Sequence, residues 1–454
     1  MARPISPSTR RRSPPREKRP RLQEITILGL FGKFDFGPIA IGGDSGSLGL
    51  TFLYGDNGVG KTTILRIVYA LLSPERNGGH RGYLGRTKFR RVSLKFEDGQ
   101  SVTAWRRSLK TTSYRLESKG PRGDFSMLVR LNETQRASGD INPLLKDYHA
   151  FTEEISPALV FVDDQRTIRS TEPDWDVQGQ VAGALVSKRH LPVVAHEDWA
   201  KVSGVDSRTY TAAALEWILD TANRHFTSRA LKDATAASVD AGQVYLSVVR
   251  TLARPTQKDN RADLSVERIL ERIRKIEKHL EIYGRFSVVQ GSVLHELANV
   301  ISKTKSTYSD QVIEVVDPYV TTIERRVESS RDLALRMALF EDGVNFFLSR
   351  KRMSCRVGER ISFVDDSGET INYENLSSGE KHLLFLCCVA VLSQDVQSII
   401  IVDEPELSLN FKWQRALIDT LVSLSGGGCQ FIMATHSFEM IARHRSSTVV
   451  LEPK

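Results

Sequence analysis

Short apolar runs alternate with polar and glycine-rich segments along the chain, and their lengths predict both strands and helices. Runs rich in β-branched and aromatic residues predict strands at 25–28 and 50–54 and within the segments 398–405 and 430–437. Longer apolar runs predict buried helices at 63–72 and 382–392. A continuous apolar run such as 398–402 is expected for a central parallel strand that is covered on both faces. The pattern therefore predicts an α/β protein with a largely parallel core.

The middle of the chain has a helical period instead. Apolar residues recur every three or four positions between charged ones at Val266, Ile269, Ile273, Ile276, Leu280 and Tyr283, and Gly284 ends the run. A second helix is predicted to start at Asp317-Pro318, as cap and first-turn proline, with Val320, Ile323, Val327 and Met337 on one side. Both are expected to be short, coiled-coil-like helices. Two interpretations stay open: packing within the chain, or an arm that docks another subunit.

Composition narrows the class of protein. A chain of 454 residues with 40% hydrophobic residues can bury a large core in two or three units. No run approaches the roughly 18 to 20 apolar residues that cross a bilayer, so a cytoplasmic protein without membrane contact is predicted. The four cysteines lack metal-like spacing and are predicted to be reduced and structural.

The net charge of +8 is concentrated at the N-terminus. Residues 1–21 hold eight Lys and Arg against the single acid Glu17, which contributes +7 and leaves +1 for the remainder. Five prolines in this stretch oppose a helix, so 1–22 is predicted to be a disordered basic tail. It is either a charge-based contact for nucleic acid or an acidic partner, or a solvated tail with no ligand.

The strongest motif follows the strand at 50–54. It is a glycine loop that leads into a helix, and it comprises Gly55, Asp56, Asn57, Gly58, Val59, Gly60, Lys61, Thr62 and Thr63. Its glycines let backbone N–H groups turn toward phosphate oxygens at a helix N-terminus. Lys61 would supply a charge to the β- and γ-phosphates, and the Thr62 hydroxyl would bind Mg²⁺. The sequence thus predicts an ATP and Mg²⁺ site.

Two further motifs lie far downstream. Asp403 and Glu404 end the apolar strand, where ligands bind in open α/β sheets. Asp403 would help hold Mg²⁺, and Glu404 would take a proton from the attacking water. Ser377 and Gly379 open a helix and form a second phosphate-binding end, which one nucleotide in one chain does not need. A last strand delivers His436.

In this order the motifs resemble those of the ABC-type ATPase superfamily. The resemblance makes 376–380 the signature motif, Asp403-Glu404 the Walker B pair, 406–410 the D-loop and His436 the switch histidine. It makes Gln165, after another apolar strand, the Q-loop glutamine and a further Mg²⁺ contact. It also implies two heads facing each other head to tail, so that Ser377 and Gly379 of one copy close over the γ-phosphate held by Lys61 of the other.

More than three hundred residues separate the phosphate loop from the signature, so a domain is inserted between them. This spacing resembles the SMC and RecF-like branch and the ATPases of bacterial anti-phage systems such as PARIS, Septu and retrons. Segments 90–96 and 102–109, with the turn 97–99, fit the antiparallel β-lobe of such heads. The predicted units are the tail 1–22, an N-terminal ATPase lobe 23–165, a helical insertion 166–349 and a C-terminal ATPase lobe 350–454.

The resemblance supports two roles. In the first, the chain is the sensor or scaffold ATPase of an anti-phage defence complex, assembles with itself as a dimer or higher oligomer, and controls a separate nuclease or toxin. In the alternative, it is a RecF-like repair or recombination ATPase that binds DNA directly.

Two positions differ from the family pattern: 29–33 has no arginine, and Ser378 replaces the first signature glycine.

Overall fold

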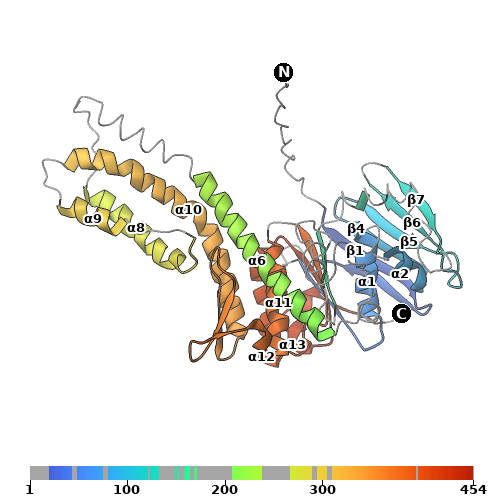
Figure 1. Ribbon diagram of the computed structural model, residues 1–454. Coiled ribbons are helices and arrows are strands. Elements are labelled where there is room, and N and C mark those ends of the chain that lie inside the picture. The colour runs from blue at the N-terminus through green and yellow to red at the C-terminus, as the bar shows by residue number, and fades with distance from the viewer. Residues whose placement is uncertain are drawn as a thin grey trace, which may run out of the picture.

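The computed structural model of the chain shows a mixed α/β head from which a group of long helices extends (Figure 1). It describes residues 20–42, 49–74, 80–120, 123–131, 148, 151–152, 158–163, 168–170, 207–237, 266–288, 294–303, 309–394 and 397–452. The predicted tail up to residue 19 and Gln165 lie outside the described residues.

The core of the head is a six-stranded sheet in the order β15-β3-β14-β13-β8-β9. Its strands are β3 (Leu50–Tyr54), β8 (Ala158–Val162), β9 (Ile168–Ser170), β13 (Ser398–Asp403), β14 (Gln430–Thr435) and β15 (Thr448–Val450). All neighbours are parallel except β8 and β9. Every residue of β13 and β14 is buried, as expected for central strands with both faces covered. The predicted parallel core is confirmed.

The register of this sheet brings three strand ends together. β14 lies between β3 and β13, with Thr435 opposite Tyr54 and Ala434 opposite Asp403. Because all three strands run in the same direction, the segments that follow them leave from one edge. The glycine loop, the Asp403-Glu404 pair and His436 therefore emerge side by side.

The two faces of the sheet carry different helices. Along β13, Ile399 and Ile401 belong to the core that contains α1 (Lys61–Leu72), whereas Ile400 and Val402 belong to the core with α11 (Ser378–Leu392) and α12 (Phe411–Ser425). This alternation follows from the period of two in a strand. Helices α1 and α11 therefore lie on opposite faces, as Figure 1 also shows.

An antiparallel sheet covers the α1 side, in the order β2-β1-β4-β5-β6-β7. Its strands are β1 (Leu22–Leu30), β2 (Phe34–Ala40), β4 (Arg91–Phe96), β5 (Ser101–Trp105), β6 (Tyr114–Lys119) and β7 (Phe125–Val129), and α2 (His80–Arg86) packs beside α1. The predicted β-lobe is present, although β1 begins at Leu22, a buried residue assigned to the tail. β5 ends before 109 because Arg106 turns inward and donates to the carbonyls of Leu84, Gly85, Thr87 and Thr111.

The inserted segment contributes the helices α6 (Ser207–Ala237), α8 (Val266–Gly284), α9 (Leu294–Lys303) and α10 (Ser309–Phe347). The sequence pattern predicted α8 and its end at Gly284, and Ile269, Ile273 and Ile276 are buried as expected. It missed α6, and the expected start of a helix at Asp317-Pro318 is wrong. α10 begins at Ser309 and runs through Pro318 for 39 residues, about 58 Å at the usual rise.

Tertiary contacts explain why α10 tolerates its proline. Pro318 has no N–H to donate and would ordinarily weaken a helix interior. Arg272 of α8 holds the segment on both sides of it, by a bond to Asp317 and by two bonds to Glu324 at 3.0 and 2.7 Å. The predicted helix start at Asp317-Pro318 rested on the preference of proline for the first turn of a helix. The pairing of Arg272 with α10 overrides that preference.

Between α10 and α11 lies a small antiparallel sheet of β10 (Lys351–Ser354), β11 (Ser362–Asp365) and β12 (Thr370–Ile371). A 3₁₀ turn (Tyr373–Asn375) leads from it into α11, and α13 (Phe438–Ile441) and a second 3₁₀ turn (Arg445–Ser447) follow β14.

All four cysteines are buried and free, and burial raises the pKa of Cys387 to about 12. None of the helices in the described ranges is long and apolar enough to cross a membrane.

Candidate nucleotide site

The glycine loop adopts a conformation that requires glycine at two positions. Gly58 and Gly60 have φ angles of 80° and 102°, in the region that residues with a side chain rarely occupy. A Cβ at Gly60 would lie 2.8 Å from Leu30 Cδ2, and one at Gly58 would point into open space. Gly60 is also the N-cap of α1 and has no side chain to cap the first-turn N–H groups. The loop and helix start form a cradle suited to an anion.

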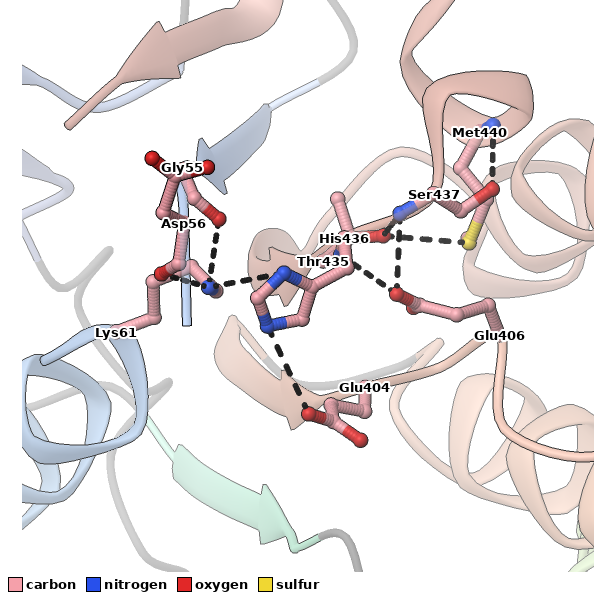
Figure 2. Close-up of polar contacts among 9 residues, drawn as sticks. All are labelled: Gly55, Asp56, Lys61, Glu404, Glu406, Thr435, His436, Ser437 and Met440. Atoms are coloured by element: carbon pink, nitrogen blue, oxygen red, sulfur yellow. Dashed lines mark hydrogen bonds and ion pairs between the residues drawn. The ribbon is translucent and has the colours of Figure 1, made fainter. Parts of the chain in front are cut away.

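Lys61 lies inside this cradle. Its side chain is buried, and Nζ donates to the carbonyl oxygens of Gly55 at 2.9 Å and Asp56 at 3.0 Å (Figure 2). Burial lowers the pKa of Lys61, while the nearby carboxylates of Glu404 and Asp403 oppose that shift. The ammonium group is thus held between the loop and the acids at the end of β13.

His436 connects Lys61 to Glu404. Its Nδ1 lies 3.3 Å from Lys61 Nζ, and its Nε2 lies 3.9 Å from Glu404 Oε1 (Figure 2). An ammonium group can only donate, so Nδ1 is the acceptor in this contact and the ring proton is on Nε2, toward the carboxylate. The structure thus brings together Lys61, Glu404 and His436, which the sequence placed in one site from motifs as many as 375 residues apart.

The residues present fit a magnesium ion. Asp403 is 1% exposed at the end of β13, and Thr62 lies in the first turn of α1. A carboxylate and a hydroxyl are the hard oxygen ligands that Mg²⁺ prefers, and this ion usually keeps several waters and substrate oxygens besides one or two protein ligands. Gln165, the third predicted ligand, cannot be placed because it lies outside the described residues.

The D-loop carries a contact that the sequence did not predict. Glu406 Oε1 accepts from the backbone N–H of His436 at 2.6 Å and of Ser437 at 3.2 Å (Figure 2). Gln414 of α12 extends the contact, because it accepts from the Ser437 hydroxyl at 2.6 Å and donates to Leu409 O at 2.8 Å. The turn after Glu404 therefore fixes the backbone that positions His436.

The signature motif is shaped by a capping box. Ser377 caps α11 by accepting from Glu380 N, and Glu380 Oε2 accepts from Ser377 N at 2.6 Å. Lys351 of β10 donates to the same Oε2 at 2.8 Å. Burial alone would raise the pKa of Glu380, but the bonds from Lys351 and Ser377 hold it below the ordinary value.

The signature is not joined to the glycine loop of its own chain. In the described part of the molecule Ser377 bonds to Glu380, and a Cβ at Gly379 would lie 2.6 Å from Ser408 O and 3.2 Å from Trp413 Cζ3. These neighbours belong to the D-loop and α12, on the face of the sheet opposite α1. The predicted second cradle therefore starts a helix on the face of the sheet opposite α1, which begins at Lys61.

Phe31 is a neighbour of the site that sequence reasoning passed over. It lies in the β1–β2 turn with φ of 55° and is 40% exposed, and its ring would lie 3.0 Å from a Cβ at Gly60. An exposed aromatic ring beside a phosphate cradle is suited to stacking on a base. The glycines on both sides of it, Gly29 and Gly32, were a signal of an unusual turn, because both have positive φ.

Comparison with known proteins agrees with this reading of the head. Residues 218–442, slightly less than half of the chain, match the family described as "AAA domain, putative AbiEii toxin, Type IV TA system". Over 138 residues the chain is 28% identical to the Streptomyces coelicolor protein described as "Putative ABC transporter ATP-binding protein SCO5958". That match covers 30% of this chain and 48% of the relative. The matched part of the chain is similar to ATPase domains of the AAA/ABC type.

The solved structures that match the chain include heads of Smc proteins. The head of Pyrococcus furiosus Smc, with an extended coiled coil and bound to the C-terminal domain of ScpA, has a TM-score of 0.35 at 14% identity, over 96% of this chain and 94% of that one. The head of Pyrococcus yayanosii Smc, with a coiled coil and joint, has a TM-score of 0.36 at 14% identity and covers 93% of each chain.

We expect Lys351→Met to destabilise the head in a pH-dependent way. The variant leaves the buried Glu380 carboxylate without its cation, so the free energy of unfolding at pH 7 should fall by about 2 kcal/mol. The pKa of Glu380 is lowered in the folded state, so the bridge contributes at neutral pH and is lost as pH falls through that folded-state value. Urea unfolding followed by circular dichroism should show that the difference in the free energy of unfolding between the parent and Lys351→Met decreases from pH 7 to below pH 4.

The neighbouring substitution Arg352→Met serves as its control, because Arg352 is exposed on the same strand. A deficit for Lys351→Met that is the same at both ends of this pH range would show that the Glu380 pair does not cause it.

Proposed function

We propose that the chain binds ATP with Mg²⁺ and hydrolyses it at sites that two copies complete. The observation that carries the proposal is the placement of the two phosphate cradles. One, at Lys61, faces Glu404 and His436, and the other, at Ser377 and Gly379, lies across the sheet from it. A single chain has no use for a second cradle on the face of the sheet opposite the helix that begins at Lys61. A second copy placed head to tail supplies each site with the missing half.

The chemistry at each site follows from the groups that the sheet aligns. Thr62 and Asp403, with Gln165, would hold Mg²⁺, which supplies charge neutralisation at the β- and γ-phosphates. Lys61 would exchange its bonds to the carbonyls of Gly55 and Asp56 for phosphate oxygens. Gly55, Asn57, Gly58, Gly60 and Thr63 complete the cradle. Phosphoryl transfer needs little covalent help from protein, so positioning of charge accounts for most of the catalysis.

The proton of the attacking water goes to Glu404. This carboxylate is 38% exposed at the edge of the sheet, and the Nε2–H of His436 faces it. His436 would orient the carboxylate and contact the γ-phosphate side of the site. Ser377 and Gly379 from the other copy would close over the γ-phosphate and exclude bulk water. Hydrolysis then opens the pair, because the group that both halves share is lost.

Glu404→Gln should bind Mg-ATP normally and hydrolyse it about 100- to 10,000-fold more slowly, because only the general base is removed. The same variant should accumulate as a closed pair in the presence of Mg-ATP, which analytical ultracentrifugation would detect. Lys61→Ala is the matched comparison: it should lose nucleotide binding and therefore form no such pair. Hydrolysis by Glu404→Gln at the parent rate would refute the assignment of the base.

Ser377→Arg should leave ATP binding by the lone head intact and prevent ATP-driven association. The long side chain would occupy the space that the second cradle offers to the partner's phosphate. Equilibrium binding of a fluorescent ATP analogue, measured beside sedimentation with Glu404→Gln in the background, separates the two effects. Asp366→Arg adds the same side chain on the exposed turn after β11 and should change neither. Normal ATP-driven association of Ser377→Arg would contradict the shared site.

For the biological role, we propose the sensor or scaffold ATPase of an anti-phage defence complex that controls a separate effector. Two observations support it. The matching family's description includes a toxin of a toxin–antitoxin system. The inserted helices α8, α9 and α10 extend away from the head and have the size of a docking arm (Figure 1). The ATP cycle would then hold and release a nuclease or toxin through this arm.

The alternative is a RecF-like ATPase that binds DNA, and the basic residues of the N-terminal segment favour it. ATP hydrolysis at physiological salt, with and without duplex DNA, distinguishes the two roles in the full chain and in a variant lacking residues 1–19. The defence role predicts a rate indifferent to DNA and a second polypeptide that copurifies from the native host. The alternative predicts that DNA stimulates ATP hydrolysis by the full chain. It also predicts that the variant lacking residues 1–19 shows weaker stimulation, with a smaller salt dependence.

A further inference from the structure

We propose that His382, a buried residue of the signature helix, positions the general base Glu404. His382 lies in the second turn of α11 and is 1% exposed. Its Nε2 lies 3.2 Å from the carbonyl oxygen of Pro405, the residue that follows Glu404. The backbone on one side of the base is thus bonded to a helix that lies on the other face of the sheet from α1.

The direction of this bond follows from its chemistry. A carbonyl oxygen can only accept, so His382 Nε2 carries a proton and donates it to Pro405 O. Proline supplies no N–H, so its carbonyl is the only backbone group of residue 405 that can hydrogen-bond. The His382 contact is therefore well placed to orient the peptide that joins Pro405 to the D-loop.

Glu404 needs such support because its backbone is strained. Its φ angle is 50°, in the left-handed region, which a residue with a side chain adopts only when its surroundings hold it there. On the strand side, Glu404 N donates to Ala434 O at 2.9 Å, and within the turn Leu407 N donates to Glu404 O at 3.1 Å. His382 adds the restraint on the residue that follows.

A second contact from the same face of α11 reinforces this restraint. Gly379 lies three residues before His382, so both are on one side of the helix. The backbone of Gly379 packs so closely on the D-loop that a Cβ would come within 2.6 Å of Ser408 O, and Ser408 itself has φ of 65°. One helix face therefore contacts the turn 404–408 at Ser408 and at Pro405, the residue after Glu404.

The inference rests on the proposed function, since it assigns a role relative to the base of that reaction. It also implies that the two nucleotide sites of the proposed pair are coupled through α11. Ser377, at the start of α11, would touch the nucleotide of the partner, and His382 on the same helix touches the turn that carries the base of its own site. Closure of Ser377 over the partner's nucleotide would then change the position of Glu404 in the other site.

The test compares His382→Leu, which keeps a similar bulk without a donor, with His382→Gln, whose amide nitrogen can donate from nearly the position of Nε2. For His382→Leu we expect kcat to fall about 10- to 100-fold, the loss typical of a misplaced catalytic group, with the Kd for Mg-ATP within threefold of the parent. His382→Gln should recover kcat to within about threefold. Phe385→Leu, also buried on α11, controls for loss of packing: it should lower Tm without lowering kcat.

The proposal is overturned if His382→Leu keeps kcat within threefold, if His382→Gln is as slow as His382→Leu, or if Phe385→Leu with an equal loss of Tm is equally slow. Should His382→Leu not fold, His382→Asn replaces it, because its shorter amide cannot reach Pro405 O and must then be slower than His382→Gln. Activity of Glu404→Gln at the parent rate would instead refute the proposed function itself, and the two failures are therefore distinguishable.

Discussion

The parallel pairing of β3, β14 and β13 is the constraint on which the rest of this structure depends. β3 leads into the glycine loop, β13 ends at the Asp403-Glu404 pair, and β14 leads into His436. These three motifs are far apart in the sequence. The register aligns Tyr54 with Thr435 and Asp403 with Ala434, so Lys61, Glu404 and His436 come within hydrogen-bond or ion-pair distance along one edge. The strands hold this register because their side chains are buried on both faces, and a slip of one residue would exchange the two cores.

The same sheet separates the glycine loop from the predicted signature motif. Alternate residues of β13 pack against α1 on one side and α11 on the other, so the helix that starts at the glycine loop and the helix that starts at the signature cannot lie together in one chain. Burial of both faces thus stabilises the head and also places α11, which Ser377 caps, on the opposite face from α1, which begins at Lys61. In the proposed assembly, a second copy resolves this separation, and the dependence of catalysis on association follows from the architecture of the core.

The turn 404–410 is the place where the parts of the head meet. It receives the end of β13, contacts α11 through His382 and Gly379, and holds the backbone of His436 through Glu406. Lys351, four residues after the end of α10, adds a link from the helical insertion to Glu380 of the signature. A partner that moved α10 would therefore have a short path of direct contacts to the predicted signature and, through α11, to the turn that carries Glu404.

Elements with local sequence signals could be predicted from the amino-acid sequence alone. β3 has the bounds that its apolar run predicts, and β13 and β14 lie within the segments that predicted them. α8 ends at Gly284, and the glycine loop turns at Gly58 and Gly60 because φ there is open only to glycine. The order of the motifs was enough to place Lys61, Glu404 and His436 in one site. The Mg²⁺ ligand Gln165 and the composite site remain predictions.

Features that depend on residues distant in the chain became visible only in the folded molecule. Local preference placed a helix start at Pro318, but Arg272 stabilises a continuous α10, and α6 has no clear apolar period because it packs against both α10 and α11. Neither the Lys351–Glu380 bridge nor the contact of His382 with Pro405 can be read from neighbouring residues. The physical reason is that a residue's own conformational preference is a small free energy, whereas burial and pairing act between segments that only the folded chain brings together.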